Sequence, residues 1–396
     1  MVREKEKVSR PHVFNGEPRL YVVCTPINLM RKFSENQPGA VMVRGLGRAF
    51  VAFQVEPDTA INPKPFDRGP AQLSFFLTLA TVIPLLVVIS THLWLRSAYT
   101  SQVFHLQGFL NQYSTGIYRY RILGPKLLLT IYRFLANHFR DQPFSMPTDA
   151  QATLLFYVSY AVLNAVLFFF SNLLLLLFLW DWKKGISDLH LACYFFLILV
   201  LTLSTYVVTP YDQLAYFLMF VGFLSVRLRT SWISYLVLAF AAVAGGINRE
   251  TEFLVTPALL TVALFTPFQE SKRYFRASLF HLVLFAACYV GVRVLLPGSA
   301  TVVAGLTFGG KWPLESFVVV SALFYVGVSL VIREYAALKP SIVLLILSSP
   351  YIATILIGGE IRELRLLVPL LLCLFFAYIQ LAQLKRAGVQ PCEGSW

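Results

Sequence analysis

The chain has 396 residues, of which 57% are hydrophobic and only 13% are charged, and its formal net charge is +13. A soluble domain carries roughly 25% charged residues, so the composition excludes a soluble globular protein. The apolar segments are unbroken runs of about 20 residues, the length of a helix that crosses the ~30 Å hydrocarbon core, and they lack the alternation of barrel strands. The sequence therefore predicts an all-α, polytopic transmembrane helix bundle.

Residues 1–71 contain scattered Pro, Gly and basic residues without sustained apolar periodicity. Such a segment offers no continuous apolar face for a core. We expect a poorly ordered cytoplasmic N-terminal tail, or an extension from a start codon assigned too far upstream. The transmembrane helical domain is expected over residues 72–386, followed by a cytoplasmic C-terminal tail over residues 387–396.

About ten spans are predicted, and the loops between them alternate in charge. Connections such as QESKRYFR are rich in Lys and Arg, whereas the later connections on the other side hold few basic residues. Because basic loops stay in the cytoplasm, we expect a multi-pass protein of the inner (plasma) membrane with both termini in the cytoplasm. The net positive charge is then topogenic and does not indicate nucleic acid. The predicted spans are residues 73–95, 153–180, 189–208, 211–226, 231–247, 252–267, 277–296, 314–332, 341–358 and 364–384.

The first outer segment, residues 96–152, departs from this charge rule. Its basic residues are Arg96, Arg119, Arg121, Lys126, Arg133 and Arg140. Exported positive charge is disfavoured in a segment of this length, so we expect these charges to have a purpose outside. Within the segment, GPKLLLTIYRFLANHF (residues 124–139) is apolar on one face and too short to span. It is predicted to lie along the membrane interface as an amphipathic helix.

Polar residues gather at the predicted outer face. A charged side chain near hydrocarbon is costly unless it is paired or hydrated, and therefore tends to mark a pathway or a site. The segments are IYRYRILGP (residues 117–125), VVTPYDQLAY (207–216), GGINRETEF (245–253), GGEIRELRLLVP (358–369) and Arg293 near the outer end of its helix. Helices of one bundle can bring Asp212, Arg249, Glu250, Glu360 and Arg362 to a common cavity, but the sequence does not show that they meet.

Each of these charges also has a simpler interpretation. Asp212 follows Pro210 at a helix start, where an acid can cap free N–H groups. Glu252 is the bystander of its cluster, and the charges around Glu360 can form salt bridges within their own loop. Arg119 and Arg121 can snorkel to the interface.

The five cysteines and six histidines show no metal-ligand or disulfide spacing. We therefore predict no metal motif. Whether the protein uses a divalent cation as a cofactor stays an open question, since two or three acids together with a bound phosphate could still hold one.

The stretches YRYRILGP, TPYDQ, NRET and GEIRELRLLVP occur with a long first outer loop, an interfacial helix and a bundle of spans over residues 73–384. Together they resemble the integral-membrane glycosyltransferases of the GT-C superfamily, in particular an uncharacterised branch of polytopic bacterial proteins related to it. The resemblance implies transfer of a sugar from a polyprenyl-phosphate-linked donor in the membrane lipid. The acceptor would be a glycan, lipid or protein on the outer (periplasmic) face, as in polysaccharide biosynthesis of the cell envelope.

The same resemblance suggests roles for individual residues. A carboxylate would take the proton from the acceptor hydroxyl as it attacks the anomeric carbon, and arginines would hold the lipid phosphate. Asp212 is the first choice of base, followed by Glu250. The candidate catalytic residues are Asp212, Glu250 and Glu360, and the candidate phosphate ligands are Arg119, Arg121, Arg249, Arg293 and Arg362.

One feature departs from the GT-C pattern. Enzymes of that superfamily typically carry an essential acid early in the first outer loop, whereas residues 96–121 contain none. The departure favours an alternative enzyme, a lipid-linked oligosaccharide polymerase or ligase. A transporter or flippase for a lipid-linked or anionic solute is the alternative outside enzymes, although the internal repeats common in transporters are not evident.

Overall fold

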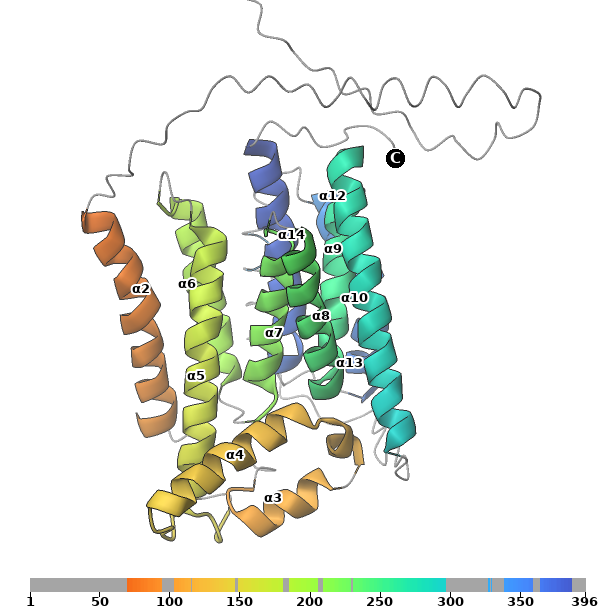
Figure 1. The fold of residues 1–396 in the computed structure, drawn as a ribbon. Coiled ribbons are helices and arrows are strands. Elements are labelled where there is room, and N and C mark those ends of the chain that lie inside the picture. Colours follow the sequence, from red (N-terminus) through yellow and green to blue (C-terminus); the bar gives the residue numbers. More distant parts are fainter. Residues whose placement is uncertain are drawn as a thin grey trace, which may run out of the picture. The chain divides into compact units, whose positions relative to one another are not determined.

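The structure is a computed structural model (Figure 1). It describes residues 70–94, 103–114, 116–146, 149–180, 185–205, 209–228, 231–296, 338–358 and 364–386, together with 327 and 329. The chain divides into two units, Met1–Ala60 with Gly394–Trp396 and Ile61–Glu393, and every described residue belongs to the second unit. The predicted N-terminal and C-terminal tails and the predicted span 314–332 lie outside the described residues, apart from single positions.

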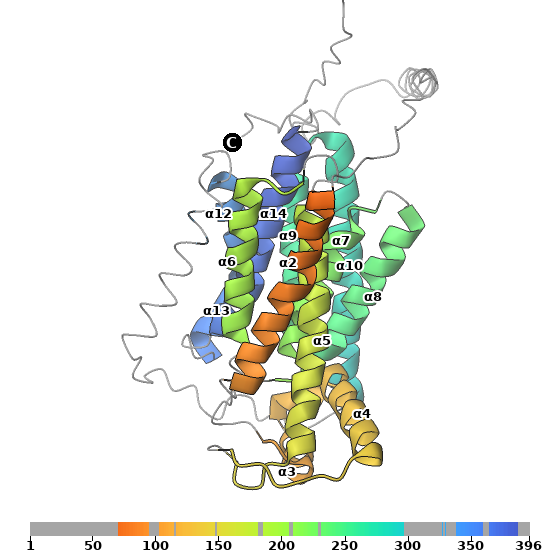
Figure 2. The ribbon, with the colours of Figure 1, turned by 90° about the vertical axis from the view of Figure 1, so that its left-hand side faces the viewer.

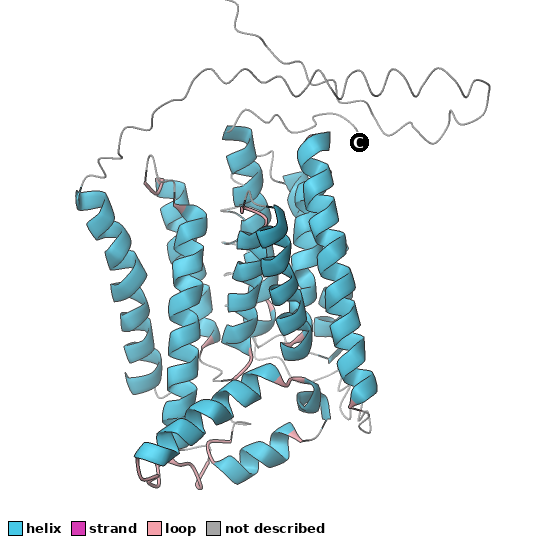
Figure 3. Ribbon diagram, viewed as in Figure 1, coloured by secondary structure: helices cyan, strands magenta, loops and turns pink. Residues whose placement is uncertain are grey.

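The described part of the chain is helical and contains no named strand (Figure 3). Two isolated β-bridges, Pro143 to Thr153 and Met146 to Asp149, close the loop before the second long helix. The principal helices are α2 (Pro70–Val88), α3 (Leu106–Tyr113), α4 (Leu123–His138), α5 (Leu154–Leu179), α6 (Asp188–Ser204), α7 (Asp212–Ser225), α8 (Ser231–Asn248), α9 (Val255–Leu264), α10 (Phe268–Leu295), α12 (Leu338–Leu347), α13 (Ser349–Gly358) and α14 (Val368–Arg386). Short pieces of 3-10 or π helix are η1 (Ile89–Trp94), η2 (Gly116–Tyr120), η3 (Glu250–Leu254) and η5 (Leu364–Leu366).

Three of these helices are long and apolar enough to cross a membrane: Ala71–His92, Leu154–Leu179 and Phe268–Leu295. A fourth candidate is the bent pair Leu338–Leu347 and Ser349–Ile355, which turns by 64° at its break. The remaining apolar helices are shorter. Their composition is compatible with a membrane protein, and the all-helical fold agrees with the sequence prediction.

Helices α3 and α4 lie across one end of the bundle, whereas the longer helices run side by side (Figures 1 and 2). The amphipathic helix predicted at residues 124–139 is present as α4, and it packs against α5. A backbone hydrogen bond of 2.9 Å from Ile122 N–H to the carbonyl of Ile247 attaches the start of α4 to the end of α8. This contact joins the first loop to a helix more than a hundred residues away in the sequence.

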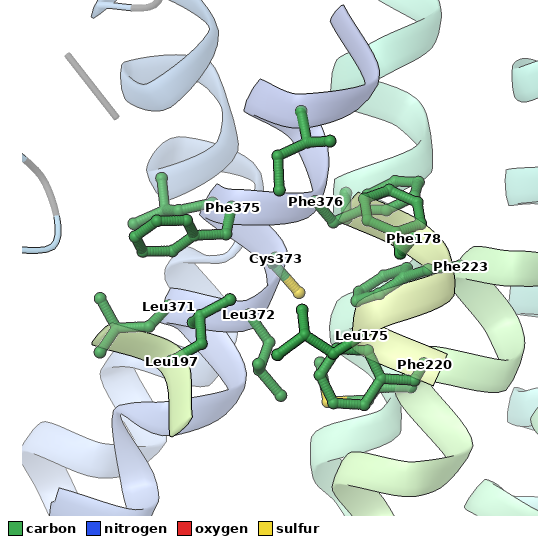
Figure 4. Packing of buried hydrophobic residues seen from close by; sticks show 14 of the residues in the cluster. Leu175, Phe178, Leu197, Phe220, Phe223, Leu371, Leu372, Cys373, Phe375 and Phe376 are labelled. Carbon is green, nitrogen blue, oxygen red and sulfur yellow. The ribbon is translucent and has the colours of Figure 1, made fainter. Parts of the chain in front are cut away.

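The hydrophobic core surrounds α14 (Figure 4). Phe376 stacks on Phe223 of α7 with ring centroids 4.1 Å apart, and Phe375 stacks on Phe196 of α6 at 5.5 Å. Such aromatic pairs add roughly 0.5–1.5 kcal/mol beyond the area they bury. The packing fixes α14 against α6 and α7.

Buried polar groups connect α2, α5 and α6 on the other side of the core. Asn172 of α5 donates to the carbonyl of Leu79 in α2 at 3.0 Å, and the hydroxyl of Tyr194 in α6 donates to Asn172 Oδ1 at 2.8 Å. A polar side chain in an apolar interior is stable only when hydrogen-bonded. This network therefore fixes the relative rotation of three helices.

Candidate functional site

The candidate site forms where α7, α8, η3 and η5 meet the chain segment before α4. Pro210 sets the start of α7, and the side chain of Thr209 accepts a hydrogen bond from Asp212 N–H at 3.1 Å. The helix-start N–H is thus satisfied by Thr209, in the manner of an N-cap. Within the described part of the chain the Asp212 carboxylate pairs with arginines and caps no helix N–H, although its place in the first turn of α7 suits an acid.

Asp212 instead lies between two arginines. Its Oδ1 pairs with Nη1 of Arg249, and its Oδ2 accepts a hydrogen bond of 3.2 Å from Nη1 of Arg365. The side chains of Asp212 and Arg249 are 3% and 4% exposed. Removing one member of a buried ion pair leaves an uncompensated charge, which is strongly destabilising. These three residues therefore act as one buried unit.

A second ion pair lies nearer the surface. Arg121 Nη2 donates to Glu250 Oε1 at 2.7 Å, and the Glu250 side chain is 40% exposed. Partial burial opposes the charged form, but Arg121 and Arg249 outweigh it and lower the pKa of Glu250 to about 2. Burial likewise opposes the charge on Arg121, while Glu250 and neighbouring tyrosines raise its pKa. Both groups are charged at neutral pH.

Tyr211 joins the two ion pairs into one cluster. Its ring centroid lies 4.4 Å from the guanidinium carbon of Arg121 and 5.3 Å from that of Arg249. Tyr118 faces Arg121 from another direction at 5.6 Å. The negative face of an aromatic ring attracts a guanidinium, so the tyrosines keep two like charges close together. Together these charged residues form the arginine cluster: Arg121, Asp212, Arg249, Glu250 and Arg365.

Close backbone approach fixes the loop that carries Arg121. Asn248 Nδ2 donates to the carbonyl of Tyr211 at 3.0 Å. A Cβ added at Gly124 would lie 2.3 Å from the carbonyl oxygen of Pro210, and one added at Gly245 would lie 2.1 Å from Cγ of Glu252. Glycine is required at both positions because only it lets the neighbouring segments come so near.

The structure brings together four of the predicted site residues, Arg121, Asp212, Arg249 and Glu250. Arg293 lies at the edge of this group, where its guanidinium faces the rings of Tyr289 at 3.4 Å and Tyr120 at 4.9 Å. Among the described residues it has no carboxylate partner. Arg119 is exposed and outside the cluster. Glu360 and Arg362 lie outside the described residues.

Two members of the site were not among the predicted site residues. Arg365 lies in the predicted polar segment GEIRELRLLVP, together with Arg362, which was the predicted phosphate ligand of that segment. Tyr211 adjoins Asp212, but the chain has 19 tyrosines, so the presence of a tyrosine at this position did not indicate a role in the site. The signal available for Arg365 was its place next to the apolar run of the last helix, where a charge needs a partner.

Glu252 was predicted to be a bystander and is fully buried. Its two carboxyl oxygens have no hydrogen-bond partner within the described part of the chain. Its side chain packs against Gly245 and takes no part in the ion pairs of the cluster.

The acids that follow α4 have structural roles. Asp149 Oδ2 accepts hydrogen bonds from Phe104 N–H at 2.7 Å and His105 Nδ1 at 2.9 Å. Asp141 Oδ1 accepts a hydrogen bond from Leu155 N–H, at the start of α5, at 3.0 Å. Both acids hold the first loop in place and do not supply the arginine cluster with a carboxylate.

No group of three or more His, Cys, Asp or Glu residues among those described could hold a metal ion. Two cavities in the described part of the chain, of about 470 and 310 Å³, lie away from the arginine cluster. What the cluster offers is concentrated charge: three guanidinium groups and two carboxylates, with one carboxylate accessible. Such an arrangement suits an anionic group bearing oxygen atoms.

No protein family, no curated protein and no solved structure matches the sequence. The geometry of the chain itself is therefore the basis for inferring its function.

Proposed function

We propose that the protein is an integral-membrane glycosyltransferase of the GT-C type. It would have about ten spans in the plasma membrane, with both termini in the cytoplasm and the arginine cluster at the outer face. It would transfer a sugar from a polyprenyl-phosphate-linked donor to a glycan, lipid or protein acceptor. The observation that carries the proposal is the convergence of three arginines and two carboxylates at one end of an apolar helix bundle, beside the amphipathic helix α4.

The donor phosphate is assigned to Arg121 in the first instance. The Arg121 side chain is only 9% exposed, but its partner Glu250 is 40% exposed, so a phosphate that displaces Glu250 can reach the planar guanidinium, which matches phosphate oxygens. Arg249 faces the same tyrosine and adds positive potential. The polyprenyl chain would lie along α4, where Phe134 is 62% exposed and an amphipathic helix suits the membrane interface.

The geometry changes the assignment of the catalytic base. Asp212 was the first choice, but it is buried and held by two arginines, whereas a base must come within hydrogen-bond reach of the acceptor hydroxyl. Glu250 is accessible, so we assign it that role and make Asp212 a positioning residue for Arg249 and Arg365. With a pKa of about 2, free Glu250 is a weak base. Its basicity would rise when the phosphate draws Arg121 away.

The proposed reaction needs no reactant besides the donor and the acceptor. The acceptor oxygen forms a bond to the anomeric carbon, the bond from that carbon to the donor phosphate oxygen breaks, and the acceptor proton passes to Glu250. The polyprenyl phosphate leaves with its negative charge stabilised by Arg121 and its neighbours.

A second candidate, a lipid-linked oligosaccharide polymerase or ligase, is favoured by two observations. The first loop supplies no carboxylate before α4, and arginines outnumber carboxylates in the cluster. In that reaction the arginines would activate the leaving phosphate, and Glu250 would only neutralise Arg121.

The test uses the full-length protein reconstituted in liposomes with a panel of polyprenyl-phosphate monosaccharides. Under the first proposal, Glu250→Gln lowers sugar transfer by about 100-fold or more, and Arg121→Gln weakens binding of polyprenyl phosphate. Arg119→Gln, which removes an exposed arginine nearby, is the matched control and retains both. Size-exclusion profiles and helical circular dichroism check that each variant is folded.

The outcomes separate the candidates. Full transfer by Glu250→Gln together with loss in Arg121→Gln favours the polymerase or ligase. Movement of the lipid-linked sugar across the bilayer without transfer favours a flippase. If the native protein does not bind polyprenyl phosphate, both enzyme proposals are wrong.

A further inference from the structure

A basic pocket lies at the end of the bundle opposite to the arginine cluster. It is formed by the end of α7, the first turns of α8 and the first turns of α10, and its volume is about 470 Å³. Helix α10 begins here with Phe268 and reaches the other end of the bundle at Arg293, beside Tyr120. The pocket is therefore separated from the arginine cluster by the length of a 28-residue helix.

The three basic side chains of the pocket differ in their partners. Arg273 Nη2 donates to the carbonyl oxygens of Val226 and Leu228, and its Nη1 lies 3.9 Å from Glu270. It thus forms a wall of the pocket by satisfying carbonyls of the turn that follows α7. Lys272 and Arg276 are one turn apart on α10 and exposed. Neither has a carboxylate partner in the described part of the chain.

Exposed apolar side chains adjoin the pocket. Trp232 and Leu236 of α8 are 66% and 63% exposed, and Leu279 of α10 is 52% exposed. Trp232 lies three positions before the lining residue Tyr235, and Leu279 lies three positions after the lining residue Arg276, so both share the lining face of their helix. Leu236 lies one turn from Trp232. In a helix bundle of this composition such a surface faces lipid tails.

We propose that this pocket binds the phosphodiester headgroup of an anionic phospholipid. Lys272 and Arg276 would contact the phosphate, and the acyl chains would lie over Trp232, Leu236 and Leu279. Basic pockets between membrane helices are suited to anionic headgroups, and the volume falls within the range of small-ligand sites. A free phosphate carries a similar negative charge but has no apolar part that would bind the exposed apolar surface beside the pocket.

Topogenic charge alone does not account for these features. Lys and Arg that fix orientation act anywhere in a loop, whereas Lys272 and Arg276 are placed on a helix face at a cavity. The inference does not depend on the proposed glycosyl transfer.

The experiment uses the full-length protein purified in a neutral detergent and measures bound lipid by native mass spectrometry. The probes are phosphatidylglycerol, phosphatidylcholine and inorganic phosphate. We expect phosphatidylglycerol to stay bound to the protein and phosphatidylcholine to dissociate from it. Inorganic phosphate at millimolar concentration should not displace the phosphatidylglycerol. The double variant Lys272→Gln with Arg276→Gln should lower phosphatidylglycerol affinity about 30-fold, since each basic residue contributes roughly 1 kcal/mol and about 1.4 kcal/mol is tenfold.

Lys339→Gln is the matched control. Lys339 is an exposed basic residue at the start of α12 and does not line the pocket, so this variant should keep the native affinity. The single variants Lys272→Gln and Arg276→Gln should each give a partial loss, which keeps the test valid if the double variant does not fold. Equal binding of the two lipids, native affinity in the double variant, or displacement by inorganic phosphate would each overturn the proposal.

Discussion

The two ends of the bundle use positive charge in opposite ways. In the arginine cluster, Arg249 is buried against Asp212 and Arg121 is hydrogen-bonded to Glu250. In the basic pocket, Lys272 and Arg276 are exposed and lack a carboxylate partner in the described part of the chain. Buried charges depend on their partners for stability, whereas exposed ones are hydrated and act at a distance. The first end should therefore be sensitive to substitution and the second tolerant.

The largest effect is expected from Arg249→Ala. This change leaves the buried carboxylate of Asp212 with Arg365 as its remaining partner, and breaking a buried pair costs about 3–5 kcal/mol. The free energy of unfolding of the detergent-purified protein measures the loss.

The double variant Asp212→Ala with Arg249→Ala distinguishes this cause from a packing defect. It removes the orphaned charge as well, so its loss should be smaller than the sum of the two single losses. Simple additivity would show that the pair is not coupled, and the contrast between the two ends would then disappear.

A smaller loss is expected from Gly124→Ala. The new methyl group would lie 2.3 Å from the Pro210 carbonyl oxygen, so the segment carrying Arg121 must move away from α7. Overpacking of this kind costs about 1–3 kcal/mol, and thermal unfolding measures it.

Gly291→Ala provides the matched control. Gly291 lies within α10, and no atom of the described residues is within 4 Å of a Cβ added there. Because alanine is the better helix former by about 1 kcal/mol, this variant should be unchanged or more stable. Equal destabilisation by both substitutions would contradict the idea that backbone approach at Gly124 holds the site.

Much of this fold could be predicted from the sequence, because long apolar runs allow little except helices in a membrane. The predicted spans 153–180 and 211–226 coincide with the helices α5 (Leu154–Leu179) and α7 (Asp212–Ser225), of which α5 alone is long enough to be a candidate span. Charge placement predicted that Asp212, Arg249 and Arg121 lie at the same face of the bundle, but it did not predict that they meet there. How many of the helices cross a bilayer stays a prediction.

The pairing within the site could not be predicted. Asp212 and Arg365 are 153 positions apart, and which of several arginines meets which acid depends on the rotation of each helix about its axis. Apolar runs are uniform around that axis and leave the rotation undetermined. For the same reason, the sequence could not show that Asp212 is enclosed while Glu250 stays accessible, and this difference reverses their proposed roles.

The ion pair of Arg121 and Glu250 should make the stability of the fold depend on pH, with an effect smaller than those of the two substitutions above. The pKa of Glu250 is lowered from its ordinary value of 4.5 to about 2. A lowered carboxyl pKa stabilises the fold above the unfolded value, and the contribution is lost as the pH falls. Stability should therefore decline as the pH drops from about 4.5 towards 2.

Other carboxylates protonate in the same range, so the measurement compares native protein with Glu250→Gln. The difference in melting temperature between the two should shrink from pH 6 to pH 3. A constant difference over that range would mean that the ion pair does not contribute through its charge.

The smallest effect is expected at the basic pocket. In lipid-free detergent, Lys272→Gln with Arg276→Gln should change the free energy of unfolding by no more than about 0.5 kcal/mol, as is usual for exposed substitutions. The one described contact at risk is that of the Lys272 ammonium with the Phe268 ring, 4.0 Å away, and exposed contacts of this kind are weak. Added phosphatidylglycerol should then stabilise the native protein more than the variant, because a ligand stabilises only the state that binds it. A large loss of stability in the absence of lipid would instead mean that Lys272 and Arg276 are bound by the protein itself, as the charges at the other end of the bundle are. The pocket would then not be a site for a lipid headgroup.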